Sequence, residues 1–260
     1  MLYSELINSW HLSPGSVEAN APLEWRQGRS VFGGLQVAVA LGAMRTLVPE
    51  MPIRSLQATL MSPLNGETLT AVATVLRQGK NAIHVEARLM EGEQTLGVVI
   101  GVFGVGRPSA VQRLPVQPVV ECATPIRMPY VEGISATFSK YFDATWLRGN
   151  TPFTGDKSND SVIELNMKDE GLTTEYHVVA IADYPPPVAI SQLTKPVSGA
   201  TMTWMLEFLT ENLTGLALDG WRIDTEMMAA KDGYTNQSLV IWGPGGVPIA
   251  LSRQTMVIFG

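Results

Sequence analysis

Apolar and polar residues follow two kinds of spacing along the chain. Two segments carry apolar residues at helical spacing, which predicts helices over residues 31–47 and 173–184. Elsewhere apolar and β-branched residues alternate with polar ones between turn signals such as NG, GKN and EGE, which predicts antiparallel strands. The predicted strands cover residues 53–63, 68–79, 82–92, 95–104, 200–209, 221–233, 237–246 and 248–260. The pattern therefore predicts an α+β protein.

The order of one helix followed by four strands occurs twice. The two copies are separated by residues 105–130, which contain Pro108, Pro115, Pro118, Pro125 and Pro129. Proline fixes φ and removes a backbone donor, so this segment is predicted to be an extended linker. Both copies also close on a Phe-Gly pair, at residues 103–104 and 259–260. We therefore predict a duplicated unit, with an N-terminal domain over 1–104 and a C-terminal domain over 131–260.

Three polar residues of the second copy stand out from this repeat. Asp183 ends an otherwise apolar helical run, directly before prolines that cannot continue a helix, and falls opposite roughly Val39 of the first copy. Gln254 falls opposite Val98 when the closing Phe-Gly pairs are matched, and Thr201 opens the first strand of the second copy. Each could be a helix cap, an ordinary strand former or a solvent-facing residue. Because the helix is expected to pack on the sheet, the three could also converge on one site.

Composition narrows the classes of function. The net charge is −6 and only 16% of residues are charged, which excludes an overall cationic field for nucleic acid or an anionic membrane. The longest uncharged apolar run, residues 96–106, is too short to span a bilayer and predicts a buried strand. The N-terminus lacks a basic and then apolar signal pattern, so a soluble, cytoplasmic protein is expected.

The inventory of reactive residues favours direct attack by water. A single cysteine, Cys122, excludes an internal disulfide and a cysteine-based zinc site. No G-x-S-x-G motif is present, and the three histidines, His11, His84 and His177, form no zinc motif. No metal and no cofactor are therefore predicted.

At the level of motifs the chain resembles the acyl-CoA thioesterase II family. VFGGLQVAVAL is similar to the start of the family's first helix, ADYPPPVA to the segment with its second-helix Asp, ATMTWMLEFL to its Thr-bearing strand and SRQTMV to its terminal-strand Gln. The resemblance covers nearly the whole chain and implies a double hotdog fold, two tandem units in which a sheet wraps a helix. It also implies hydrolysis of an acyl-CoA to a free acid and CoA, and further association into a homo-oligomer, a dimer or higher.

Carried over residue by residue, the resemblance makes Asp183, Thr201 and Gln254 the catalytic set. The chain departs from the family at Leu35, which separates Gly34 from Gln36, and at Thr203-Trp204, which replace an Asp-His pair. In a regular strand Thr203 would face the same side as Thr201, so it stays an alternative catalytic threonine. Thr201 is preferred because its spacing from Phe208 matches the family.

These residue types suit the activation of a water molecule. Asp183 would be the base or the group that orients the water, and the end of a helix dipole and apolar neighbours should raise its pKa and make it a better base. Thr201 and Gln254 would position the water by hydrogen bonds. The backbone N–H groups of Gly33 and Gly34 could bind the thioester oxygen, or the two glycines could only allow close helix packing.

Two other functions are compatible with the same fold. A non-catalytic acyl-CoA-binding protein would keep the fold without turnover. A hotdog enoyl-CoA hydratase usually carries a histidine five residues after the aspartate, where this chain has Pro187, Val188 and Ala189. The hydratase is therefore disfavoured.

Overall fold

The computed structural model describes residues 1–122 and 124–259. Ala123 of the predicted linker and Gly260 of the second Phe-Gly pair lie outside the described residues. The first half contains α1 (Tyr3–Asn8), β1 (His11–Ser13), β2 (Ser16–Asn20), β3 (Arg26–Gln27), β4 (Ser30–Val31), α2 (Gly33–Leu47), β5 (Ile53–Leu60), β6 (Thr68–Gln78), β7 (Ala82–Glu91) and β8 (Gln94–Gly104). The second half contains β9 (Ile126–Met128), β10 (Phe142–Arg148), β11 (Asp160–Met167), α3 (Glu175–Ala182), α4 (Val188–Ser191), β12 (Ser198–Phe208), β13 (Trp221–Lys231), β14 (Tyr234–Gly243) and β15 (Val247–Phe259).

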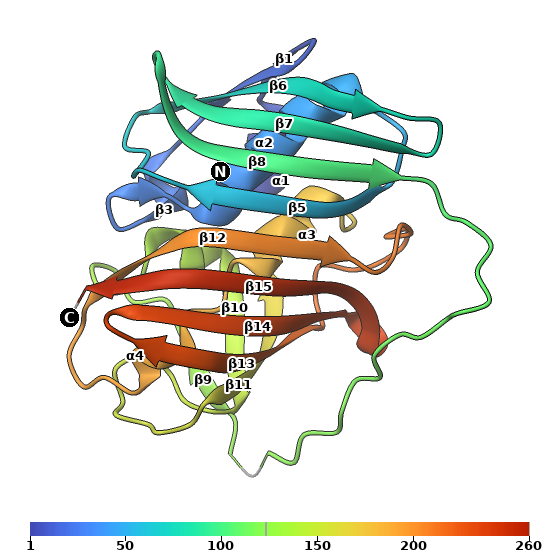
Figure 1. Ribbon diagram of the computed structural model, residues 1–260. Coiled ribbons are helices and arrows are strands. Elements are labelled where there is room, and N and C mark those ends of the chain that lie inside the picture. The colour runs from blue at the N-terminus through green and yellow to red at the C-terminus, as the bar shows by residue number, and fades with distance from the viewer. Residues whose placement is uncertain (123, 260) are drawn as a thin grey trace.

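One large antiparallel sheet runs through both halves. Its strand order is β1-β2-β6-β7-β8-β5-β12-β15-β14-β13-β11-β10-β9, and only the short β3–β4 pair stands apart among the described strands. The halves meet where β5 pairs with β12, with Leu56 opposite Leu206 and both side chains buried. Figure 1 shows this junction at the middle of the sheet. The two halves are therefore joined by backbone hydrogen bonds as well as by their packing.

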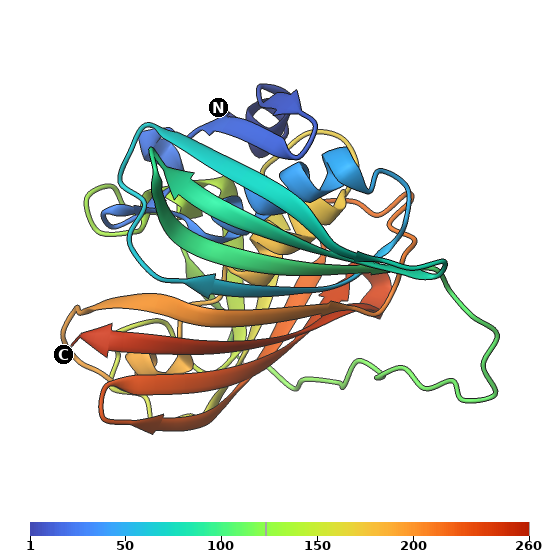
Figure 2. The same cartoon turned by 45° about the horizontal axis from the view of Figure 1, so that its top comes forward.

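Helices α2 and α3 lie together on the inner side of the curved sheet, as Figures 1 and 2 show. From Gly33 to Met44 every residue of α2 is buried, as expected for an apolar helix that is covered on all sides. The helix ends before Pro49, because a proline disfavours helical geometry in the residue that precedes it. Helix α3 begins at a capping box formed by Thr174 and His177 and ends at Ala182, three residues before Pro185. Both main helices thus end shortly before a proline, and α3 also begins at a local capping signal.

The predicted helices and strands are confirmed to within a few residues. The two helices correspond to α2 and α3, and the eight strands correspond to β5–β8 and β12–β15. One correction concerns the predicted linker, because residues 126–128 form β9, in which Met128 pairs with Ala144 of β10. The domain boundaries at 1–104, 105–130 and 131–260 stay a prediction. In the described part of the chain, no helix combines the length and the apolar character that crossing a membrane requires.

Candidate active site

The carboxylate of Asp183 lies between the two helices. Asp183 is the C-cap of α3, and Pro185 prevents the helix from continuing beyond it. Its side chain reaches the first residue of α2, where a Cβ placed on Gly33 would come 2.6 Å from Asp183 Oδ2. Only glycine leaves room for the carboxylate at this position. The prolines and Gly33 therefore place one acidic group where the C-terminus of α3 meets the N-terminus of α2.

The surroundings of Asp183 hold its pKa close to neutrality. Burial raises the pKa from 3.8 to about 7, while the backbone N–H of Gly34 and the amide of Gln254 lower it. The sequence predicted only the C-terminus of α3, whose negative dipole end disfavours a charged carboxylate. The structure adds the N-terminus of α2 on the opposite side, and its positive dipole end favours the charged carboxylate. A carboxyl group with a pKa near neutrality can both accept and return a proton, as a general base must.

Gln254 is in direct contact with this carboxylate. It lies in β15, is 1% exposed, and its Nε2 donates to Asp183 Oδ1 over 2.8 Å. Its Oε1 accepts from Nε2 of Gln237 in β14 over 3.1 Å. The Oε1 of Gln237 in turn accepts the backbone N–H of Val188 over 3.1 Å. The expected meeting of Asp183 and Gln254 is thus present, and Gln237 is an added partner that the sequence analysis did not identify.

A β-bulge separates the two candidate threonines. In the pairing of β12 with β15, Thr201 lies opposite Met256 and Thr203 opposite Thr255, with a register shift between them. Because Thr255 and Met256 are neighbours, their side chains lie on opposite faces of the sheet. The prediction that Thr203 faces the same side as Thr201 is therefore wrong, since the bulge adds a residue between them.

The same register places Thr201 on the inner face of the sheet. Gln254 and Met256 are two residues apart and share that face, and both are buried, whereas Thr203 is exposed. Among the described residues, no hydrogen bond joins the Thr201 hydroxyl to Asp183 or Gln254, so Thr201 shares a face with Gln254 without bonding to the pair. Of the two threonines, Thr201 is therefore the one that shares a face with Gln254, and its catalytic role stays a prediction.

Gly34 has a packing role of its own. A Cβ on Gly34 would lie 3.0 Å from the Ala180 Cα of α3 and 2.6 Å from a ring carbon of Phe32. The Phe32 ring stacks on Phe138 with centroids 4.0 Å apart, and Phe138 meets Tyr184 edge-on at 6.2 Å. Close helix packing is thus observed at Gly34, while the oxyanion role of the two glycines stays a prediction. The aromatic contacts hold Tyr184, and with it the adjoining Asp183, against the start of α2.

His177, the buried histidine of α3, is committed elsewhere. Its Nε2 lies 3.1 Å from Asp169 Oδ2 and its Nδ1 accepts the backbone N–H of Thr174 over 3.0 Å. Hydrogen bonds from His177 and Ser4 lower the pKa of Asp169, although burial acts in the opposite direction. The imidazole therefore belongs to the start of α3 and is not a hydrogen-bond partner of Asp183.

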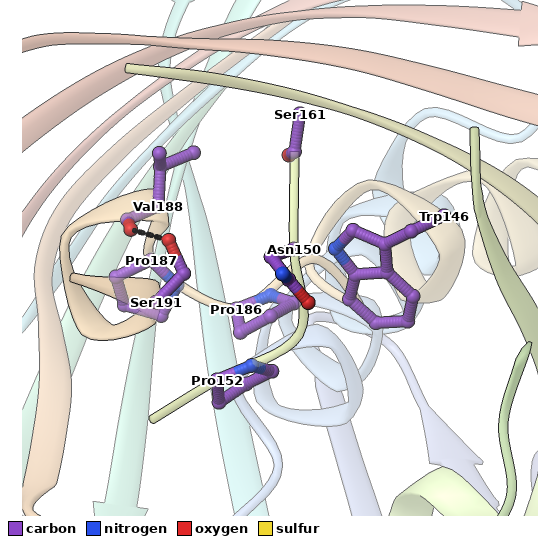
Figure 3. A pocket seen from close by; sticks show the side chains of 8 residues that line it. All are labelled: Trp146, Asn150, Pro152, Ser161, Pro186, Pro187, Val188 and Ser191. Atoms are coloured by element: carbon purple, nitrogen blue, oxygen red, sulfur yellow. Dashed lines mark hydrogen bonds between the residues drawn. The ribbon is translucent and has the colours of Figure 1, made fainter. Parts of the chain in front are cut away.

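A small cavity lies beside the proline segment that follows Asp183, residues 185–187, and is shown in Figure 3. Pro186, Pro187 and Val188 line one side and Trp146 lies across from them, while the Ser191 hydroxyl donates to the Val188 carbonyl over 2.8 Å. Its volume is about 10 Å³, roughly the space for one water molecule. The segment is therefore firmly packed from behind, and this cavity is too small for an acyl chain.

The geometry can now be compared with known proteins. The model of the acyl-CoA thioesterase N-terminal domain matches residues 21–104, and that of the acyl-CoA thioesterase C-terminal domain matches residues 117–258. A comparison with curated proteins found no match.

Three solved structures illustrate the fold. A conserved protein of unknown function with a hot dog fold from Alicyclobacillus acidocaldarius has a TM-score of 0.86 at 17% identity, covering 98% of this chain and 97% of that one. The acyl-CoA thioesterase II TesB2 from Mycobacterium marinum has a TM-score of 0.73 at 15% identity, covering 98% and 96%. The tesB protein of Mycobacterium avium subs paratuberculosis has a TM-score of 0.77 at 11% identity, covering 99% of each chain. The chain has the predicted double hotdog fold, and it belongs to the acyl-CoA thioesterase family.

Proposed function

We propose that this chain hydrolyses an acyl-CoA thioester to a free carboxylic acid and CoA. The observation that carries the proposal is the contact of Asp183 with Gln254 beside Gly33, in a setting that raises the pKa of the carboxyl to about 7. Family membership supports the acyl-CoA substrate class. The site residues proposed are Asp183, Thr201 and Gln254, with Gly33 and Gly34 on the side of the thioester oxygen.

The reaction needs one water molecule and one proton carrier. Asp183 takes a proton from the water, whose oxygen bonds to the thioester carbonyl carbon while the π electrons move to the carbonyl oxygen. Because the Gly34 N–H bonds to Asp183 in the resting site, the Gly33 N–H and the dipole of α2 are the first groups to stabilise that negative oxygen, and the Gly34 N–H can join them once Asp183 carries the proton. Collapse of the intermediate breaks the carbon–sulfur bond, and the proton held by Asp183 passes to the leaving thiolate. The carboxyl group thus ends in the state in which it began.

Gln254 and Thr201 supply orientation in this scheme. The Gln254 amide holds one carboxylate oxygen of Asp183, which leaves the other oxygen to receive the proton. Thr201, on the same face of the sheet, offers a hydroxyl that can both donate to and accept from the water. Holding water, base and substrate in one geometry is itself a large part of catalysis.

Hydrolysis of a panel of short-, medium- and long-chain acyl-CoAs, followed by release of free thiol, tests the proposal. We expect turnover by the wild type and a loss of about 100-fold or more in Asp183→Asn, which keeps the size of the side chain but cannot act as a base. Turnover that survives the substitution would overturn only the role of Asp183 and would leave the proposed thioesterase activity standing. No turnover on any chain length would favour the acyl-CoA-binding alternative, and hydration of an enoyl-CoA would favour the hydratase. Homo-oligomerisation and a cytoplasmic location stay predictions.

A further inference from the structure

A chain of side-chain amides leads from the proline segment to the carboxylate. The Val188 N–H donates to Gln237 Oε1, Gln237 Nε2 donates to Gln254 Oε1, and Gln254 Nε2 donates to Asp183 Oδ1. Gln237 is fully buried at 0% exposure and lies directly opposite Gln254 in the pairing of β14 with β15. The four groups come from the segment after Asp183, from two neighbouring strands and from the end of α3.

The backbone N–H of Val188 fixes the direction in which this chain of hydrogen bonds runs. A primary amide has a donating end and an accepting end, so it can be inserted into a hydrogen-bond chain in two orientations. A backbone N–H can only donate, so Val188 requires the oxygen of Gln237 to face it. The Gln237 nitrogen must then face Gln254, which turns the Gln254 oxygen toward Gln237 and its nitrogen toward Asp183. The Val188 N–H therefore determines that the N–H end of the Gln254 amide, and not its oxygen, faces Asp183.

We propose that Gln237 is a positioning residue that fixes the Gln254 amide with its N–H, and not its oxygen, toward Asp183. The inference rests on the proposed function for its kinetic consequence, but its structural content is independent of turnover. An N–H aimed at Asp183 favours the charged base, whereas an oxygen in the same place would favour the protonated acid. Gln237 thus preserves the base form of Asp183 against the burial that raises its pKa.

Few other groups act on Asp183. The buried phenol of Tyr3 in α1 donates to the Tyr176 carbonyl over 3.3 Å, and burial together with Tyr176, Asp169 and Asp183 raises its pKa well above 10, so it stays neutral. From α2 the backbone of Gly34 contributes an N–H. On α3 itself, His177 is bound to Asp169. Against burial, two hydrogen bonds therefore favour the charged form of Asp183, one from the backbone of Gly34 and one from the Gln254 amide, and the second depends on how that amide is oriented.

The test substitutes Gln237→Met, which keeps the length and removes both hydrogen-bonding ends. Thr235→Val is the matched control, because Thr235 lies two residues away on the same face of β14, is 1% exposed and donates a hydrogen bond to the Ala229 carbonyl. The pKa of the Asp183 carboxyl is measured by ¹³C NMR titration in the wild type and in both variants. In Gln237→Met we expect it to rise by about one unit, because the Gln254 amide is no longer held with its N–H toward the charged form of Asp183.

Steady-state kinetics distinguish a loss of Gln254 positioning from a general loss of protein stability. Well below neutral pH, kcat should fall by about tenfold in Gln237→Met with KM unchanged, because a pKa one unit higher reduces the ionised fraction of the base to about a tenth of its wild-type value. Thr235→Val should lower the stability without moving the pKa. An unchanged pKa in Gln237→Met, or an equal shift in Thr235→Val, would overturn the inference. If the wild type does not hydrolyse thioesters, the proposed function fails, while the NMR titration still decides the role of Gln237.

A measurement on the wild type covers the case in which Gln237→Met does not fold. The side-chain amide resonances of Gln254 and Gln237 should both move with pH, at the midpoint at which Asp183 titrates, because hydrogen bonds in a chain polarise one another. A Gln237 amide that does not respond to the ionisation of Asp183 would refute the proposed chain.

Discussion

Replacing Asp183 by asparagine should make the protein more stable, by an amount that grows with pH. The asparagine oxygen can still accept from Gln254, while the charge is removed. In the wild type the folded-state pKa of about 7 lies above the unfolded value of 3.8, so the folded state holds this proton more tightly. The stability that this group contributes is fully present below its unfolded pKa and is lost as the pH rises to about 7.

The size of the effect follows from the pKa difference. A shift of about three units corresponds to about 4 kcal/mol at most, at 1.36 kcal/mol per unit. The half-buried side chain keeps some contact with solvent, which reduces the expected value to roughly 2–3 kcal/mol. Asparagine does not titrate, so the stability difference between variant and wild type should increase by this amount between about pH 4 and about pH 8.

Urea unfolding of both proteins across that pH range measures the difference directly, because the other titrating groups cancel in the comparison. Asp169→Asn gives a control of opposite sign, since the lowered pKa of Asp169 stabilises the fold above its unfolded pKa and that contribution is lost as the pH falls. A difference between Asp183→Asn and wild type that stays constant with pH would show that the carboxyl is not held near neutrality. The role assigned to burial would then be wrong.

Three further substitutions test the geometry of the site. Gly33→Ala should lower kcat/KM by about 100-fold in steady-state assays, because the added Cβ displaces the Asp183 carboxylate, and normal activity would contradict the close contact. Thr201→Val should lower kcat by roughly fivefold to tenfold through loss of one hydrogen bond, whereas Thr203→Val on the outer face should not; the reverse result would place the site on the other face. Gly34→Ala should reduce the free energy of unfolding by about 1–3 kcal/mol, because it crowds the backbone of α3, and an unchanged urea midpoint would argue against that contact.

Hydrophobic spacing was sufficient to predict the two main helices and the eight long strands, because each buries a regular apolar face. It did not predict the short β1 and β2, and it overlooked β10 and β11, which lie outside the repeated order of one helix and four strands. These strands extend the two ends of the sheet. Their positions depend on pairing with distant segments, and a repeat search gives no information about such pairing.

The match between the two copies was wrong in detail. The closing Phe-Gly pairs suggested that Gln254 corresponds to Val98, but Phe103 is fully buried while Phe259 is 60% exposed. Val98 pairs with Arg88 and Thr59, which are exposed, so it lies on the outer face of the sheet, whereas Gln254 lies on the inner face. Residues that the Phe-Gly alignment matches, such as Val98 and Gln254, therefore lie on different faces of the sheet. A register shift of one residue is enough to move a side chain from one face to the other.

The candidate site shows the same limit of sequence reasoning. Asp183 and Gln254 could be predicted from polarity and resemblance because each interrupts an apolar pattern. The register shift that separates Thr201 from Thr203 has no local sequence signal, since it adds an ordinary residue to a strand. Gln237 was overlooked because a glutamine in a strand usually faces solvent, and only the pairing of β14 with β15 shows that this one is buried.

The pairing of β5 with β12 has a consequence for how the chain can be divided. Were the halves produced separately, each would present a long unpaired strand with an apolar inner face, which is a template for aggregation. A single cut between residues 105 and 122 would leave that pairing intact, and no described residue of this stretch belongs to a helix or strand. A nicked protein should therefore stay assembled and active, whereas two halves made apart should be insoluble unless they are produced together. Function here depends on a shared row of backbone hydrogen bonds more than on the covalent connection between the halves.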